Sequence, residues 1–363
     1  MEATIKTSWK SSPVPSVKNL ANESLAAVPP RYVRPDQDSP SLSNVTSSLP
    51  QVPVIDMSKL LSPDSMDSEL DKFHHAFKEW GFFQLINHGM SSSLLEKLKA
   101  ETEEFFNLPM EEKKKKLWKE PGEIEGFGEA FVVSEEQKLN WSDAFFVISL
   151  PTHLRKPNLI PKLPLPFRDT LKAYSAELKI LAMKILNQMA KALRMEADDI
   201  KEFFEEGIQG IRLNYYPPCP QPELVMGLNP HSDNVGLTIL LQLNEMEGLQ
   251  FKKDGIWVPV KPVPNAFVIN IGDMLEIVTN GIYRSNEHRA TVNSVKERLS
   301  VGTFYSPKID GNIGPAPSLI TPQTPALFKT ISMAEYLKGI FSSERRGGSY
   351  LDVMRRKNEE ESG

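Results

Sequence analysis

The feature that most restricts the fold is a change of hydrophobic pattern near residue 207. Residues 166–195 carry apolar side chains at three-to-four spacing, which predicts one long helix with its stripe in the core. Residues 209–307 instead contain short β-prone runs separated by Pro and Gly. Helices followed by a strand-rich block predict an α+β chain, with a β-sandwich or barrel packed by helices.

The remaining sequence divides by composition. Residues 1–50 are rich in Ser, Pro and Asn without sustained periodicity, so we expect an irregular N-terminal arm. We also expect short strands near 52–55 and 81–88, and helices over 66–80 and from 91 onward. The expected regions are 1–50 (arm), 51–165 (N-terminal region), 166–206 (supporting helices), 207–310 (β-rich core) and 311–363 (C-terminal helices and charged tail).

Composition limits the partners and the compartment. A formal net charge of −5 argues against nucleic acid as a partner. Cys219 is the only cysteine, so no internal disulfide can form, which fits a reducing compartment. The first thirty residues lack an apolar segment of signal-peptide type, and the longest apolar run, 144–150, is too short to span a bilayer. We therefore expect a cytoplasmic monomer that binds neither nucleic acid nor membrane.

The chemistry is concentrated in the triplet at 231–233 and in a later histidine. His231 and Asp233 are two residues apart beside the apolar run 236–244, so extended backbone directs them to the same side. Two imidazoles, the second from His288, and one carboxylate suit a non-haem ferrous ion with open positions for small ligands. Alone, the triplet also fits a surface turn or a capped helix start, and a lone histidine is more often structural.

A cation and a hydroxyl follow at strand spacing. Arg298 and Ser300 lie two apart in the β-prone run 298–305, which places guanidinium and hydroxyl on one face. Such a pair can hold a carboxylate of a dicarboxylic acid beside the metal. The alternative for these two residues is a solvent-facing strand edge.

The order of these motifs resembles the plant 2-oxoglutarate/Fe(II)-dependent dioxygenases, over roughly residues 50–340. Three further segments are similar to that family: WGFFQLINHG at 80–89, NYYPPCP at 214–220 and PNAFVINIGD at 264–273. Within the family the chain looks closest to the branch that holds alkaloid O-demethylases of the thebaine and codeine type and related hydroxylases.

The resemblance implies the fold and the cofactors. It implies a double-stranded β-helix (jelly-roll) core over 207–310, preceded by an N-terminal dioxygenase region over 51–165. Fe(II) would be bound by His231, Asp233 and His288. The cosubstrate 2-oxoglutarate would be held by Arg298 and Ser300, with Tyr216 and Asn214 as further polar groups. Tyr216 could equally pack beside Pro217.

The implied reaction hydroxylates or O-demethylates an alkaloid or phenolic plant metabolite with O2, releases succinate and CO2, and uses ascorbate as reductant. Two alternatives stay open. A cosubstrate-independent iron oxidase would place its substrate in the Arg298 pocket and form no succinate. A non-catalytic binding protein would hold its small-molecule ligand equally well without iron.

Four residues are candidates for substrate contact. Phe304 shares a face with Arg298 by even spacing, so it could stack on an aromatic substrate or fill the core. Arg212 shares a face with Asn214 and could hold a polar substituent or form a structural ion pair. Phe127 belongs to an aromatic-rich segment, 119–166, which could line the pocket. The resemblance also implies a departure: Ala144 and Ser306 stand where flavonoid-oxidising members of the family look to carry tyrosine and glutamate, which puts a flavonoid substrate in doubt and suggests a different pocket.

Overall fold

The protein is described from a computed structural model, which covers residues 14–23, 25–34, 50–120, 123–129, 132, 134, 136–344 and 350–356. Its centre is a sheet of eight strands, in the order β1-β2-β10-β7-β12-β5-β4-β3. The strand bounds are β1 (Val54–Asp56), β2 (Phe82–Ile86), β3 (Gly126–Phe127), β4 (Asp143–Leu150), β5 (Ile208–Tyr216), β7 (Leu237–Gln242), β10 (Phe267–Ile271) and β12 (Arg298–Ser306).

A smaller sheet has the order β6-β11-β8-β9. Its strands are β6 (Leu228–His231), β8 (Leu249–Lys253), β9 (Ile256–Pro259) and β11 (His288–Ala290), and a separate pair joins β13 (Asn312–Ile313) to β14 (Ile331–Ser332). From β5 to β12 the chain passes back and forth between the large and the small sheet. This alternation is a double-stranded β-helix, so the predicted α+β fold with a jelly-roll core is confirmed.

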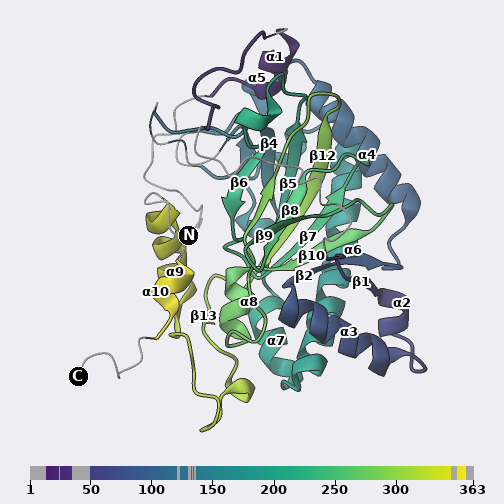
Figure 1. The fold of residues 1–363 in the computed structure, drawn as a ribbon, viewed down its shortest axis with the longest axis vertical. Coiled ribbons are helices and arrows are strands. Elements are labelled where there is room, and N and C mark those ends of the chain that lie inside the picture. Colours follow the sequence, from purple (N-terminus) through teal and green to yellow (C-terminus); the bar gives the residue numbers. More distant parts are fainter. Residues whose placement is uncertain are drawn as a thin grey trace.

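The α-helices are α1 (Val17–Asn22), α2 (Met57–Leu60), α3 (Met66–Glu79), α4 (Ser92–Asn107), α5 (Met110–Lys116), α6 (Leu165–Leu193), α7 (Ala197–Phe204), α8 (Asp273–Val278), α9 (Met333–Glu344) and α10 (Leu351–Met354). Helices α3, α4 and α6 pack against one another on one side of the large sheet, whereas α9 and α10 lie at the left of the view, away from them (Figure 1). Short 3-10 turns are η1 (Thr152–Leu154), η2 (Ile160–Lys162), η3 (Pro222–Leu224) and η4 (Pro317–Leu319). Among the described residues, no helix has the length and apolar character needed to cross a membrane.

The long helix α6 forms where the periodicity predicts it. Its apolar stripe, including Leu178, Ile185 and Met189, is fully buried in the main core together with Ile211 of β5 and Ile239 of β7. A helix this long is stabilised mainly by burying such a stripe rather than by intrinsic propensity. The strand-rich block departs from expectation at one place, because α8 interrupts it.

The N-terminal arm is more ordered than its composition predicts. Residues 17–22 form helix α1 (Val17–Asn22), and the Asp143 carboxylate of β4 accepts hydrogen bonds from Ser16 Oγ (2.5 Å) and from the backbone N–H groups of Val17 (2.8 Å) and Lys18 (3.2 Å). Tyr32 packs edge-on against Trp141 at 5.3 Å between ring centroids. The expectation of a mostly irregular arm is therefore wrong for α1, whereas 25–34 contain only turns and bends. Partners more than a hundred positions away hold both segments in place.

Candidate active site

A cavity of about 270 Å³ lies between the two sheets. The small sheet contributes His231 and His288 to its wall, and the large sheet contributes Arg298 and Ser300. Asp233 comes from the segment between β6 and β7. The fold therefore brings the three predicted metal donors, Arg298 and Ser300 to one cavity, although they span 70 positions of the chain.

The two histidines are directly opposite each other on paired strands. His231 ends β6 and His288 begins β11, and the antiparallel register aligns them. The Nε2 atoms of both rings lie 3.6 Å from Asp233 Oδ1. Nitrogen or oxygen donors of all three residues lie within 4.8 Å of one another. Three donors converging from one side form the arrangement that a non-haem iron site requires.

Neighbouring groups fix the orientation of each donor. His231 Nδ1 is 2.7 Å from the carbonyl oxygen of Asn229, and His288 Nδ1 is 3.3 Å from that of Asn286. These contacts hold a proton on Nδ1 and leave both Nε2 atoms free to bind a metal. The other Asp233 oxygen, Oδ2, accepts hydrogen bonds from Thr238 Oγ1 (2.6 Å) and Asn270 Nδ2 (2.9 Å). The donor set therefore fits a divalent iron.

The protonation states of two of the three donors also suit metal binding. At His231, burial favours the neutral imidazole, but the hydrogen bond and charge of Asp233 outweigh it and raise the pKa, so a metal would displace a proton there. Burial alone would raise the pKa of Asp233, but the two histidines and the Thr238 hydroxyl hold it well below its usual range. Burial lowers the pKa of His288 to about 4, against the opposing effect of Asp233. A carboxylate and a neutral imidazole are the forms that coordinate metal, so little proton release is needed at these two residues.

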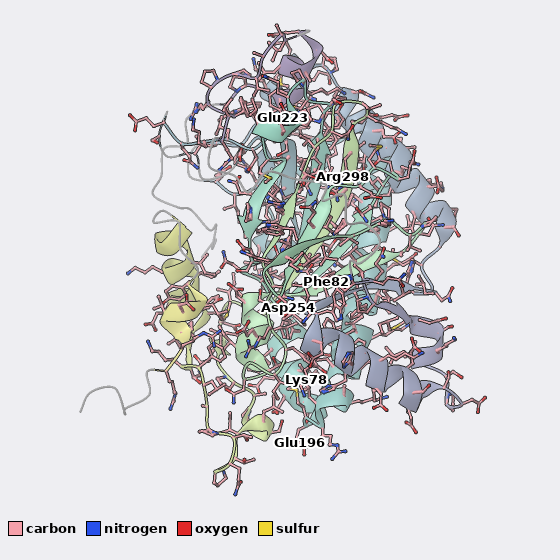
Figure 2. The ribbon with its side chains drawn as sticks, viewed as in Figure 1. Lys78, Phe82, Glu196, Glu223, Asp254 and Arg298 are labelled. Atoms are coloured by element: carbon pink, nitrogen blue, oxygen red, sulfur yellow. The ribbon has the colours of Figure 1, made fainter. Side chains whose placement is uncertain are left out.

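Arg298, the cation of the site, has no acidic partner among the described residues. Arg298 is 3% exposed, and its Nη2 donates to Gln242 Oε1 at 3.2 Å while its guanidinium lies 5.1 Å from the Tyr216 ring centroid. Its Nε is buried without a partner, and no described carboxylate forms an ion pair with it. A buried, unpaired guanidinium is costly in the absence of an anion. Figure 2 labels Arg298 on β12, toward the end of the sheet where Glu223 also lies.

Strand register brings the other predicted cosubstrate residues beside this cation. In the β12–β5 pair, Arg298 is opposite Tyr216 and Ser300 is opposite Asn214. Asn214 Nδ2 is 3.4 Å from Ser300 Oγ, and all four side chains line the cavity. The combination of an unpaired guanidinium and a hydroxyl fits one carboxylate of a dicarboxylic acid whose other end reaches the metal donors.

The four predicted substrate residues divide into two groups. Phe304 and Arg212 line the cavity. Phe127 is 1% exposed and packs in the main core with Phe105 and Phe106, so it does not line the cavity. Ala144 is also outside the lining, although it pairs with Asn214 across the β4–β5 ladder.

The aromatic-rich segment therefore contributes mainly to packing. Trp141 and Phe145 are fully buried in hydrophobic clusters, and Phe131 lies outside the described residues. The aromatic content of 119–166 predicts that the segment is packed rather than solvated. It does not show toward which side of β4 each ring points.

The groups that support the metal donors and the cation are not among the residues predicted from the sequence. These are Thr238, Asn270 and Gln242, each of which lies on a strand that is otherwise apolar. A polar residue within a buried strand needs a hydrogen-bond partner, and this signal was available in the sequence. The sequence does not identify that partner, because Asn270 and Asp233 are 37 positions apart.

Comparison with known proteins agrees with this geometry. Residues 207–307 match the model of the 2OG-Fe(II) oxygenase superfamily, and residues 52–163 match that of the non-haem dioxygenase in morphine synthesis N-terminal domain. The chain belongs to the 2OG-Fe(II) oxygenase superfamily. It is therefore an Fe(II)- and 2-oxoglutarate-dependent oxygenase in its reaction class.

Relatives cover nearly the whole chain of this oxygenase. Oxoglutarate-dependent flavonoid 7-O-demethylase 1 of Ocimum basilicum is 59% identical, over 98% of this chain and 95% of its own. Codeine O-demethylase of Papaver somniferum is 52% identical, over 94% and 96%. The crystal structure of JOX2 in complex with 2OG, Fe and JA superposes with a TM-score of 0.85 at 35% identity, covering 95% of this chain and 99% of that one.

Proposed function

We propose that this oxygenase hydroxylates or O-demethylates a small plant specialised metabolite. The observation that carries the proposal is that one cavity holds three convergent metal donors and a buried guanidinium, which has no acidic partner in the part of the chain that the structure describes. Relatives named as flavonoid and codeine O-demethylases support a phenolic or alkaloid substrate class. The flavonoid relative also weakens the expectation against flavonoids that Ala144 and Ser306 suggest.

Each side chain has a distinct part in the proposed site. His231, Asp233 and His288 would bind Fe(II), which together with O2 and 2-oxoglutarate supplies the oxidising chemistry. Arg298 and Ser300 would bind the far carboxylate of 2-oxoglutarate, with Tyr216 stacked beside the guanidinium and Asn214 beside the hydroxyl. The apolar wall of the cavity would exclude water and orient the carbon that is oxidised.

Succinate formation tests this proposal directly. Purified protein is supplied with Fe(II), ascorbate, 2-oxoglutarate and a panel of phenolics, flavonoids and alkaloids, beside His231→Ala and Arg298→Ala. We expect succinate to rise with one substrate class and to disappear in both variants, but not in Lys172→Ala on the exposed side of α6. Substrate oxidation without succinate would instead indicate a cosubstrate-independent oxidase. Equal ligand binding with and without iron, and no turnover, would indicate a binding protein.

Three further features belong to the proposal. Ascorbate is the proposed reductant, because Fe(II) bound at an open site is prone to oxidation between turnovers. A cytoplasmic location is supported by the single buried cysteine, Cys219. The large hydrophobic residues exposed on the described surface are scattered rather than gathered in one patch, which supports a monomer without a membrane partner. The net charge of −5 supports a protein that does not bind nucleic acid.

A further inference from the structure

The segment that carries Asp233 lies outside both sheets. Strand β6 ends at His231 and β7 begins at Leu237, so residues 232–236 belong to no strand ladder. We call residues 232–236 the metal loop. Because Asp233 supplies one of the three converging donors, another part of the protein must hold this loop in place.

The beginning of helix α8 lies directly against the metal loop. The backbone N–H of Asp273 donates to the carbonyl oxygen of Asp233 at 2.8 Å, and that of Met274 donates to the carbonyl oxygen of Val235 at 3.0 Å. The first N–H groups of a helix have no partner within the helix, so these bonds satisfy polar groups of both segments.

Gly272, the residue before α8, makes this close contact possible. A Cβ atom at this position would overlap the carbonyl oxygen of Val235 and would lie 2.8 Å from that of Asp233. Both oxygens belong to the backbone, so they cannot rotate away as the end of a side chain could. Any other residue at position 272 would therefore displace the metal loop, and Asp233 with it.

The side chain of Asp273 provides a second attachment. It is 0% exposed, and its Oδ2 accepts a hydrogen bond from Ser232 Oγ at 3.2 Å. Ser232 stands between His231 and Asp233 in the chain, whereas Asp273 is not one of the converging metal donors. A buried carboxylate needs hydrogen-bond donors, so this contact stabilises Asp273 as well as the loop.

Helix α8 also holds the segment that precedes the third metal donor, His288. Glu276, one turn after Asp273, is 3% exposed, and its Oε2 accepts from the backbone N–H of Ser285 at 2.8 Å. The carbonyl oxygen of the next residue, Asn286, is the one that lies beside His288 Nδ1. One short helix therefore contacts both segments that supply the metal donors.

We propose that Gly272 and Asp273 are positioning residues that set the place of Asp233 in the metal site. Gly272 permits the close approach of the metal loop, and Asp273 anchors the loop through its backbone N–H and through Ser232. Neither residue lines the cavity, although both belong to the segment 264–273 that resembles the family. The inference rests on the proposed function, because it concerns the same metal donors.

Metal binding by the full-length protein tests the inference without turnover. Titration calorimetry measures the Mn(II) affinity of wild type, Ser232→Ala, Asp273→Ala and the double variant. We expect each single variant to bind Mn(II) about tenfold more weakly, the usual effect of removing a group that orients a metal ligand. The double variant should also lose about tenfold rather than about a hundredfold, because both changes break the same hydrogen bond.

Two matched controls separate positioning from general stability. Ser175→Ala removes a buried hydroxyl of α6 outside the cavity and should leave Mn(II) affinity within about twofold. Gly272→Ala should weaken Mn(II) binding, whereas Gly311→Ala, where a Cβ would make only ordinary contacts, should not. The absorption spectrum of bound Co(II), which reports the ligand geometry, should change in Gly272→Ala and Asp273→Ala and stay the same in both controls.

Three results would overturn the inference: an unchanged Mn(II) affinity in Ser232→Ala, a loss of about a hundredfold in the double variant, or an equal loss in Ser175→Ala. Ser232 is only partly buried, so Ser232→Ala decides the question even if a variant of the buried helix does not fold. Failure of the proposed function has a different signature, because wild-type protein would then bind neither Mn(II) nor 2-oxoglutarate.

Discussion

Thr238 offers a sharp test of how the cavity prepares its metal donors. Its hydroxyl donates to Asp233 Oδ2 at 2.6 Å and leaves Oδ1 facing both histidines. Thr238→Val keeps the shape and removes this donor. A hydrogen bond to a charged group contributes about 1.5–3 kcal/mol. Because Asn270 still donates to the same oxygen, we take the lower value, about 1.5 kcal/mol, which corresponds to about tenfold weaker metal binding.

The assay measures the affinity for Mn(II), or for Fe(II) under nitrogen, by titration calorimetry. Thr238→Ser should restore most of the affinity, because it restores the hydroxyl. Thr303→Val is the matched control: Thr303 is equally buried on the neighbouring strand β12 but does not line the cavity. Metal affinity unchanged in Thr238→Val, or lowered equally in Thr303→Val, would refute the idea that outer hydrogen bonds orient Asp233.

Three other predictions follow from the buried charges. Arg298→Gln should weaken 2-oxoglutarate binding by about tenfold or more, measured by calorimetry, while Mn(II) affinity stays within about twofold. Asp143→Asn should speed hydrogen exchange in the ordered arm by about tenfold, through loss of about 1.5 kcal/mol of hydrogen bonding, and leave exchange in α6 unchanged. Burial lowers the pKa of Lys113 to about 8, so between about pH 8 and 10 this group holds more protons in the unfolded chain, and its contribution to stability rises with pH. Denaturant unfolding at the two pH values should show that Lys113→Met loses a gain on the order of 2 kcal/mol that wild type and Lys114→Met share.

The sequence predicts the parts of the site that depend on local geometry. Spacing of two within extended backbone correctly pairs Arg298 with Ser300, since both line the cavity from β12. The same rule applies less strictly to the triplet, because β6 ends at His231 and Asp233 lies in the connection that follows. The triplet still converges because Thr238 and Asn270 hold the carboxylate from neighbouring strands.

What the sequence could not predict depends on partners that are distant along the chain. Helix α1 has only six residues, and two distant partners order it: Asp143, more than 120 positions later, caps its first turn, and Val17, Leu20 and Ala21 pack in the cluster that contains Trp141. Phe127 looks like a pocket residue by composition, yet it packs against Phe105 and Phe106 of α4. Only the three-dimensional path of β3 and β4 decides which side of the sheet receives such a ring.

The position of β12 has a consequence for how the protein acquires its site. This strand is one of the last in the chain, yet it lies between β5 and β7 at the centre of the large sheet. The β12–β5 pair joins residues about 90 positions apart. Such contacts form late in folding, because the intervening chain must first lose conformational entropy. A nascent chain that ends before residue 298 would expose the edges of β5 and β7 to aggregation. Bound 2-oxoglutarate would therefore favour the fully folded state over any partly folded one.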